Sequence, residues 1–542
     1  MTDYSAKDLL ARGFLPVELP PCFVSHTLGD AYPVLSDRPD DCSAKKDIHV
    51  LPTSFHLARQ GTLRRRLSIP HPLYYTQLCQ CIEQHSQVLS AALALSTWSR
   101  SKPIPNDGAN GRAFDRPLKD SLIVEAHASV RATSRYLVQA DISQFYHSVY
   151  THTLGWSLGG KARAKDLAKA TKKDRPNLEA NPDYRGALLG NILDTKLRNL
   201  QDGQSVGLPM GPDASLLLAE VLLCSVDVLL QEELDRMDIK VVAMRNVDDY
   251  HIGVQSYDDA EKVLTLLQNL LRIELELTLN PRKTKIITLP APLEEVWVTR
   301  LKGIFRESAS PHRQKRRDLL RLFDLATAAR SQYPEEHVFS YLLGILRHVN
   351  VEKENWALLQ PILLQIALAE SGALRQMLID LLWYQSRGCL IDTSLWRTVW
   401  ERIIIANAAQ EHSSEVVWAL WGLRELELPL SQAVVSALLQ MNDPIVSLLA
   451  LCLAQQGRCE NAADLGRLMQ TYQQRVSVEN FWGEQWPLVY EATKQGWLSA
   501  PEALKNDRGY QLLTEQGVTF LDQTKRLDPH DLERLKGYGS PS

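Results

Sequence analysis

Two acidic sequences about a hundred residues apart hold the side chains best suited to chemistry in this chain. In the first, the hydrophobic run YLVQAD ends at Asp141. In the second, two strand-like runs flank Asn246-Val247-Asp248-Asp249, and a β-hairpin here would place adjacent carboxylates at its tip. Two Mg²⁺ ions about 4 Å apart, as used in phosphoryl transfer between nucleotides, need such oxygen ligands from neighbouring strands. The pattern indicates Asp141 and Asp248 as bridging ligands, with Asp249 assisting.

An Asp-Asp pair alone is weak support, because Asp258-Asp259 in SYDDAEKV is explained more simply as the start of a helix. Two further segments make the pattern more specific. Between the acidic sites, GQSVGLPMGPDAS forms a Gly/Pro-rich turn that leads into a long apolar helix. After the hairpin, LNPRKTKIITLP places Lys283 between a turn and an apolar strand, where it can protonate a departing pyrophosphate.

The order and content of these segments resemble the palm of reverse transcriptases. Asp141 with FYHS is similar to that family's first palm motif, GLPMGPDAS to its second, NVDD to its Y-x-D-D box and LNPRKT to the lysine motif that follows. Upstream, RRRLSIPHP at 64–72 resembles the fingers segment in which an Arg meets the incoming triphosphate; Arg65 matches best, with Arg66 as the alternative. The resemblance covers roughly residues 55–290.

The resemblance implies a set of site residues and cofactors. Tyr146 matches the aromatic position that clashes with a ribose 2′-hydroxyl, which implies deoxynucleotide substrates. Asn246 stands where most relatives have Tyr or Phe, and Met210 where many have Gln; these departures put template contacts in doubt. Two Mg²⁺ ions are implied, with Mn²⁺ as an alternative. The implied catalytic residues are Asp141, Asp248, Asp249 and Lys283, the metal ligands Asp141, Ile142, Asp248 and Asp249, and the substrate-binding residues Arg65, Arg66, Phe145, Tyr146, Pro209, Met210 and Gly211.

The elements that must position these residues change character along the chain. Up to about residue 300, strand-like runs alternate with helical stretches, which predicts an α+β unit with right-hand polymerase fingers and palm, as in reverse transcriptases. Beyond it, Leu-, Ala- and Trp-rich segments predict an all-α, HEAT-like helical-repeat domain. Nine of the twelve tryptophans fall there, and we expect them to pack between helices, a base-stacking platform being the alternative. The expected divisions are 1–305, 306–527 and a flexible tail over 528–542.

The composition excludes a protein that is basic over its whole surface. The chain has 542 residues, with 60 basic and 64 acidic side chains and a net charge of −4, so any contact with nucleic acid must come from local patches. The segment KARAKDLAKATKKDR, residues 161–175, has seven basic and two acidic residues; both a nucleic-acid channel and a solvated helix face explain it. Eight cysteines without a C-x-x-C pair, no secretory signal and no long apolar run predict a cytoplasmic protein without a membrane span.

The C-terminal half is similar to that of bacterial abortive-infection and defence-associated reverse transcriptases, chiefly over Glu411 to Leu426. The resemblance implies an RNA-directed or template-independent DNA polymerase that adds dNTPs to a 3′-hydroxyl in anti-phage defence. Implied partners are RNA or single-stranded DNA, a noncoding RNA and further copies of the chain. The alternative is a catalytically decayed palm that acts as an RNA- or protein-binding scaffold in defence signalling.

Overall fold

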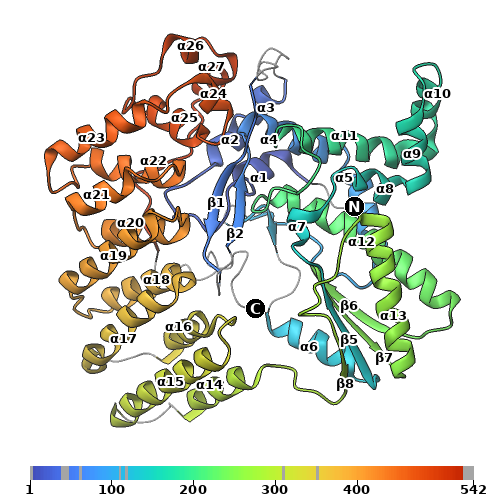
Figure 1. The fold of residues 1–542 in the computed structure, drawn as a ribbon, viewed down its shortest axis with the longest axis horizontal. Helices are drawn as coiled ribbons and strands as arrows, with labels where there is room; N and C mark the ends of the chain where they lie inside the picture. Colours follow the sequence, from blue (N-terminus) through green and yellow to red (C-terminus); the bar gives the residue numbers. More distant parts are fainter. Residues whose placement is uncertain are drawn as a thin grey trace.

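The chain returns on itself, so that its C-terminal helices meet its N-terminal segment. The computed structural model describes residues 4–37, 48–59, 64–108, 111–115, 120–307, 312–349 and 353–528. In Figure 1 the N-terminal helices lie at the upper centre and a four-stranded sheet lies at the lower right. From there the later helices cross below and climb the opposite side until they reach the N-terminal segment again.

The four-stranded sheet is antiparallel and has the order β6-β7-β5-β8. Its strands are β5 (Tyr136–Asp141), β6 (Val242–Asn246), β7 (Asp249–Val254) and β8 (Lys285–Thr288). Strands β6 and β7 form the predicted hairpin, in which Asn246 pairs with Asp249. Because Asp141 pairs with Asp249 on the other side, the register brings both acidic sequences to one end of the sheet.

Helices cover both faces of this sheet, as the alternating side chains of β5 require. Leu137 packs with Met244 of β6 and Val130 of α6 (Asp120–Arg131) on one face. Val138 and Ala140 join the main core on the other face, with α12 (Asp213–Arg236) and α13 (Tyr257–Leu270). Helix α12 is apolar around most of its circumference because it is surrounded by protein.

The remaining elements of the first 300 residues frame the sheet. The hairpin of β1 (Thr53–Leu57) and β2 (Arg65–Ile69) and a short pair of β3 (Ile104–Pro105) and β4 (Phe114–Asp115) form two small sheets. The helices are α1 (Ala6–Ala11), α2 (His26–Asp30), α3 (Tyr32–Leu35), α4 (Pro72–Gln84), α5 (Ser86–Ala94), α7 (Phe145–Ser148), α8 (Thr153–Gly159), α9 (Lys161–Lys169), α10 (Arg175–Ala180), η2 (Pro182–Tyr184), α11 (Arg185–Asn199) and the π-helical turn η3 (Leu271–Leu275).

From Val296 to Glu515 the regular structure of the described residues is entirely helical. The elements are α14 (Val296–Glu307), α15 (His312–Gln332), α16 (Val338–Val349), η4 (Lys353–Asn355), α17 (Trp356–Ala369), η5 (Ser371–Ala373), α18 (Leu374–Ser386), α19 (Thr393–Ala408), α20 (Ser413–Glu425), α21 (Gln432–Leu438), α22 (Pro444–Gln455), α23 (Ala462–Gln473), α24 (Val478–Trp482), α25 (Trp486–Lys494), α26 (Glu502–Lys505) and α27 (Arg508–Glu515). Seven of the nine tryptophans from Trp356 to Trp497 are buried, which confirms the predicted packing role; Trp356 of α17, for example, contacts Tyr384 of α18 with ring centroids 5.2 Å apart.

The C-terminal helices share one hydrophobic core with the N-terminal segment. Trp486 of α25 donates from Nε1 to the carbonyl of Ile69 at 3.2 Å, and Trp418 of α20 donates to the carbonyl of Glu18 at 3.0 Å. Phe23 and Leu521 form a β-bridge. The strand β2 is therefore supported by helices more than 340 residues further along the chain.

Two further observations bear on the sequence predictions. Within the described residues no helix is both long and apolar enough to cross a membrane. The seven described cysteines are free, and six of them are buried, in agreement with a role as small apolar core residues. The predicted flexible tail lies outside the described residues from residue 529 onward.

Candidate active site

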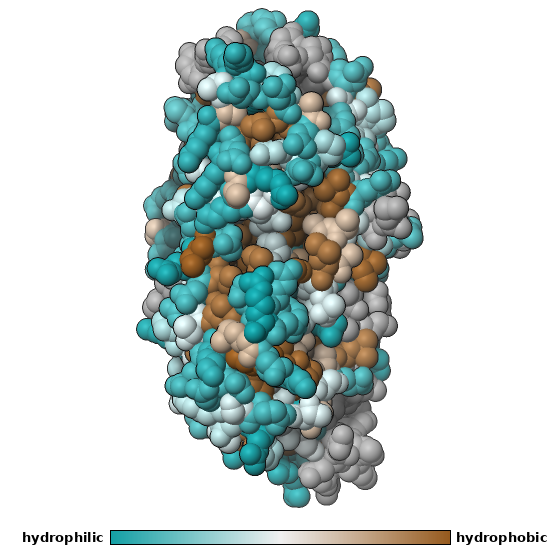
Figure 2. Space-filling model, turned by 90° about the vertical axis from the view of Figure 1, so that its right-hand side faces the viewer, coloured by the Kyte–Doolittle hydropathy of each residue, from teal (hydrophilic) through white to brown (hydrophobic). Residues whose placement is uncertain are grey.

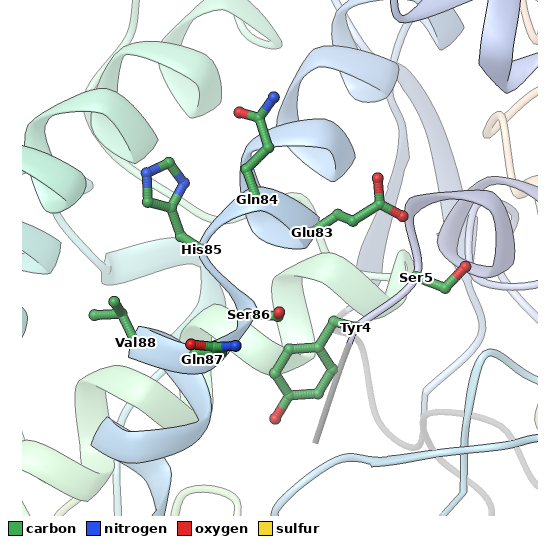
Figure 3. Close-up of a pocket in the computed structure, with 8 residues that line it drawn as sticks. All are labelled: Tyr4, Ser5, Glu83, Gln84, His85, Ser86, Gln87 and Val88. Carbon is green, nitrogen blue, oxygen red and sulfur yellow. The ribbon is translucent and has the colours of Figure 1, made fainter. Parts of the chain in front are cut away.

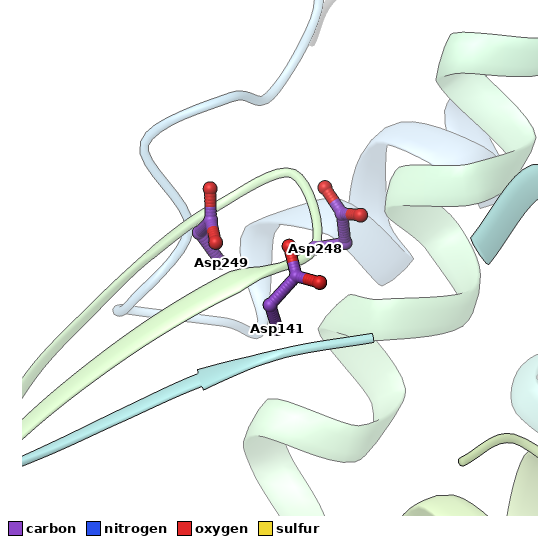
Figure 4. Close-up of side chains that lie close together, drawn as sticks. All are labelled: Asp141, Asp248 and Asp249. Atoms are coloured by element: carbon purple, nitrogen blue, oxygen red, sulfur yellow. The ribbon is translucent and has the colours of Figure 1, made fainter. Parts of the chain in front are cut away.

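Three carboxylates converge where β5 ends and the β6–β7 hairpin turns. Asp141 is the last residue of β5, Asp248 lies in the turn, and Asp249 is the first residue of β7. Ligand oxygens of all three lie within 4.8 Å of one another, and Figure 4 shows the side chains gathered around one point. Three hard oxygen donors so close together fit Mg²⁺ or Mn²⁺, and a bound cation would offset the negative charge that they concentrate.

The electrostatics of the cluster reflect this crowding. Burial, reinforced by the charge of Asp141, raises the pKa of Asp248 to about 6. Burial and the charges of Asp248 and Asp141 raise the pKa of Asp249 to about 7. Each shift means that the charged form is disfavoured in the folded protein without a cation. A divalent ion would reverse the balance by favouring the ionised carboxylates.

Lys283 and Asn280 reach the cluster from the turn before β8. Lys283 donates from Nζ to Asp141 Oδ2 at 2.8 Å, and Asn280 donates from Nδ2 to Asp141 Oδ1 at 3.1 Å. Burial lowers the pKa of Lys283, but the hydrogen bond and the charge of Asp141 outweigh it, so the pKa is raised. The structure thus brings Lys283 to the carboxylates as a charged ammonium group.

A buried ionic network lies directly beneath the turn. Arg245, in β6, is completely buried and donates to Asp227 at 2.8–3.0 Å and to Glu220 at 3.2 Å, both on α12. It also donates from Nη1 to the carbonyl of Val247 at 2.8 Å. Val247 has a φ of +53°, a left-handed conformation that is unfavourable for a β-branched residue. We conclude that the network helps to hold the turn that presents Asp248.

Two serines extend this network from the segment before β3, which lies alongside β6. Ser101 donates from Oγ to Glu220 Oε1 and accepts a hydrogen bond from the backbone N–H of Val247 at 2.7 Å. Ser99 donates to the other oxygen, Glu220 Oε2, at 2.8 Å, and no bond from Ser99 to the turn is present among the described residues. Ser101 therefore joins the buried network to the backbone of the turn.

Strand β2 presents the two candidate arginines differently. Arg65 lies close enough to Asp248 for its charge to lower the pKa of that carboxyl, against the larger effect of burial. Arg66 donates from Nε to Ser54 Oγ on β1 at 2.9 Å. Since successive residues of a strand point to opposite faces, Arg65 is the better placed of the two to act on a ligand at the carboxylates.

The remaining predicted substrate-binding residues lie close to one another. Phe145 and Tyr146, on α7, are buried and in edge-to-face contact, with ring centroids 5.4 Å apart. The carbonyl of Tyr146 accepts a hydrogen bond from Leu208 at 2.7 Å, which fixes α7 to the Gly/Pro-rich turn.

Within that turn, Pro209 is buried and Met210 is partly buried against the core. Gly211 has a φ of +127°, and a Cβ there would lie 2.8 Å from Pro16 Cγ. The turn is thus anchored to β2 and the N-terminal segment, since the carbonyl of Met210 accepts from Ser68 at 2.8 Å. Ile142 is also buried, and its N–H donates to the carbonyl of Asp248 at 3.3 Å.

Sequence reasoning missed Asn280, Ser101 and the Arg245 network. Arg245 carried a usable signal, because a lone Arg within an apolar strand next to two acidic residues is expected to have buried partners. Ser101 carried none, because a serine in a polar stretch is ordinarily exposed.

A separate cavity lies away from the carboxylates. It has a volume of about 510 Å³ and is lined by Tyr4, Ser5 and residues 83–88 at the junction of α4 and α5 (Figure 3). Its carboxylate, Glu83, accepts hydrogen bonds from the N–H of Ala6 at 2.9 Å and the hydroxyl of Tyr32 at 2.6 Å. These contacts tie α1 and α3 to α4, so we assign Glu83 a structural role.

Comparisons with known proteins leave the family open. No protein-family model matches the sequence, and no curated protein matches it. Among solved structures, apo telomerase from Candida tropicalis is 10% identical over 79% of this chain and 70% of its own, with a TM-score of 0.33. Telomerase from Candida albicans in complex with a fragment of telomeric RNA is 12% identical over 70% of this chain and 65% of its own, with a TM-score of 0.30.

A form of the C. tropicalis enzyme truncated from its C-terminal domain is 13% identical, with a TM-score of 0.29, and this chain spans only 51% of it. At such TM-scores the similarity assigns neither fold nor function.

Proposed function

We propose that the protein is a metal-dependent nucleotidyltransferase of the reverse-transcriptase type that extends a 3′-hydroxyl with deoxynucleotides. The observation that carries this proposal is the convergence of Asp141, Asp248 and Asp249 within 4.8 Å at the end of an antiparallel sheet. The motif order of the sequence supports it, because the first, third and fourth palm-like motifs contribute Asp141, the Asp248–Asp249 pair and Lys283 to this cluster.

Asp141, Asp248 and Asp249 would hold two divalent ions, with the backbone of Ile142 as a neighbouring ligand position. When bound, such ions favour ionisation of the attacking hydroxyl and neutralise charge on the triphosphate. In the reaction the 3′-oxygen forms a bond to the α-phosphorus, the bond from that phosphorus to the oxygen leading to the β-phosphate breaks, and pyrophosphate leaves.

The neighbouring residues have roles that follow from their positions. Arg65 would bind the triphosphate, since its charge already acts on Asp248. Lys283 would exchange its bond with Asp141 for one with the leaving pyrophosphate, to which it donates a proton. Tyr146, five residues past Asp141, would exclude the 2′-hydroxyl of a ribonucleotide.

The first experiment measures incorporation of labelled dNTPs by the purified chain with Mg²⁺ or Mn²⁺ and with RNA, DNA and no added primer. Asp248→Asn should abolish incorporation, because it removes a ligand without changing the size of the side chain. Asp258→Asn is the matched control and should leave incorporation unchanged, since Asp258 is exposed and pairs with Lys262 on α13. Absence of incorporation by the wild type under every condition would refute the proposal.

We further propose template-independent synthesis as one mode of this activity, because Asn246 and Met210 depart from residues associated with templated synthesis. Sequencing of the product decides between the modes. Random or homopolymeric DNA supports template independence, and complementarity to a defined RNA contradicts it. A role in anti-phage defence predicts that Asp248→Asn removes protection from phage infection in cells that express the protein.

A further inference from the structure

A basic arm, defined as residues 153–199 from α8 to α11, projects from the sheet-bearing side of the molecule at the upper right of Figure 1. Its helices α8 and α11 cross with their backbones in contact. A Cβ at Gly190 would lie 2.3 Å from the backbone of Gly155, and one at Gly159 would lie 2.2 Å from the backbone N of Ala187. Helices that touch through glycines in this way cannot shift without separating, so the arm is a fixed projection.

The outer part of the arm has a small core of its own. Ala164 and Leu167 of α9 and Ala187 of α11 are buried together, and Trp156 and Leu178 pack against them. Ala164 and Leu167 are three residues apart and therefore face inward on the same side of α9. This orientation leaves the opposite side of α9 to solvent.

That opposite side carries a row of lysines. Lys161, Lys165 and Lys169 follow one another at four-residue spacing, which places them on one face of α9. Lys172 and Lys173 follow directly after the helix and are exposed, as are Lys165 and Lys169. At the base of the row, Lys161 Nζ lies 4.1 Å from the centroid of the Trp156 ring.

Within the described residues, no ion pair joins these lysines to an acidic side chain. Asp166 accepts a hydrogen bond from the Tyr184 hydroxyl at 3.3 Å, and Asp174 accepts one from Thr171 at 2.6 Å. The one ion pair found for residues 161–175 in the described structure joins Arg175 to Glu179. Like charges four residues apart destabilise a helix, so the row is unfavourable for α9 on its own.

A rigid, protruding row of unneutralised lysines is the pattern expected of a surface that binds a polyanion. Figure 2 views this side of the molecule, and its upper part is mainly hydrophilic. The chain as a whole has a net charge of −4, so the row is a local feature and not part of a general basic surface. We propose that the lysine row of the basic arm binds the phosphate backbone of the nucleic acid on which the proposed polymerase acts.

This inference rests on the proposed function for the choice of a nucleic acid as the polyanion. Contacts between lysines and phosphates depend on charge and not on base sequence, so single-stranded RNA and single-stranded DNA should bind to the same residues. The affinity should fall steeply with salt, because each neutralised phosphate releases counterions.

The test measures fluorescence anisotropy of labelled single-stranded RNA and DNA about 30 nucleotides long, in EDTA so that no synthesis occurs. The variant changes Lys165, Lys169, Lys172 and Lys173 to Gln. The matched control changes four lysines that lie elsewhere on the surface, Lys7, Lys240, Lys262 and Lys505, to Gln, and so removes the same net charge. Circular dichroism and the melting temperature check that both variants fold.

We expect the arm variant to bind both nucleic acids at least about tenfold more weakly than the control at about 100 mM salt. The slope of log affinity against log salt should fall by roughly 3, at about 0.7 for each lost phosphate contact. Equal binding by the arm variant and the control would overturn the inference, and so would a wild type that binds neither nucleic acid. Because no nucleotide or metal is present, these outcomes are independent of whether the protein incorporates dNTPs.

Discussion

At the scale of single residues, the geometry of the carboxylates depends on side chains that never touch a substrate. The Asp248 turn contains Val247 in a left-handed conformation and is held from below through Ser101 and Arg245. The carboxylates themselves were predictable, because their chemistry is visible in the sequence. Their support was not, because the contact between Ser101 and Val247 joins residues 146 positions apart.

Ser101→Ala and Ser99→Ala form a matched pair that tests this support. Each variant removes a hydrogen bond to one oxygen of Glu220, so each should destabilise the fold by about 1–3 kcal/mol. Only Ser101→Ala also leaves the N–H of Val247 without its acceptor.

We therefore expect Ser101→Ala alone to weaken Mn²⁺ binding by about tenfold, equivalent to roughly 1.4 kcal/mol. Titration of each purified variant with Mn²⁺, followed by electron paramagnetic resonance of the free ion, measures this affinity independently of catalysis. Equal Mn²⁺ affinity in the two variants would show that Ser101 does not position the turn.

The crowded carboxylates also predict how stability depends on pH. The pKa values of Asp248 and Asp249 are about 6 and about 7 in the folded protein, against about 3.9 for an unfolded Asp. Between about pH 4 and pH 7 these two carboxyls bind more protons in the folded state than in the unfolded state, so their contribution to the free energy of unfolding falls as pH rises through this range. Without divalent ions, Asp248→Asn should remove part of this decrease in the free energy of unfolding and so raise the melting temperature at about pH 8.

Thermal unfolding at about pH 5 and pH 8, with and without Mg²⁺, measures this effect. We expect Asp248→Asn to stabilise the metal-free protein at about pH 8 by on the order of 1 kcal/mol, and Mg²⁺ to stabilise the wild type more than the variant. If, in EDTA, the melting temperature of the wild type rose from pH 5 to pH 8 as much as that of the variant, the raised pKa of Asp248 would be contradicted.

At the scale of elements, local pattern predicted the β6–β7 hairpin, because its two strands and the polar turn between them are adjacent in the sequence. The close packing of α8 against α11, which holds the basic arm, was not predictable. In the sequence, Gly155, Gly159 and Gly190 are isolated glycines within helical segments. Only the structure shows that they lie where two backbones meet. Replacing a helical glycine by alanine can thus either lower or raise the stability of the protein, depending on what lies next to it.

Gly190→Ala and Gly466→Ala test this difference. In α11, a Cβ at Gly190 would lie 2.3 Å from the backbone of Gly155, so the substitution must push α8 and α11 apart. In α23, a Cβ at Gly466 meets nothing within 4 Å, and Ala there should stabilise the helix by about 0.5–1 kcal/mol. Chemical denaturation should show Gly190→Ala destabilised by about 1–3 kcal/mol and Gly466→Ala stabilised. If both substitutions changed the free energy of unfolding in the same direction, the close packing of α8 against α11 would be refuted.

At the scale of the whole molecule, the C-terminal helices are part of the structure that holds the proposed fingers strand β2. Helical periodicity predicted these helices, and their tryptophans were expected between helices. What periodicity could not supply is where the array ends, because contacts such as Trp486 with Ile69 join residues more than 400 positions apart. The division at 305/306 remains a prediction about the chain's organisation, while the core runs across it without a break.

This shared core predicts that the two halves stay together after the chain is cut between Glu307 and His312. Phe14 contacts Trp486 and Phe520 with ring centroids 6.1 and 5.7 Å apart, and these buried aromatic side chains would enter water if the halves separated. Exposing each such side chain costs about 1.5–3 kcal/mol.

A protease recognition sequence inserted between Glu307 and His312 should allow complete cleavage, after which both fragments elute together in size-exclusion chromatography and retain dNTP incorporation. Trp486→Ala in the cleaved protein should promote separation, whereas Leu390→Ala should not, because Leu390 is 87% exposed. Separate elution of the unsubstituted fragments would show that the helices form an independent domain and that β2 does not need them.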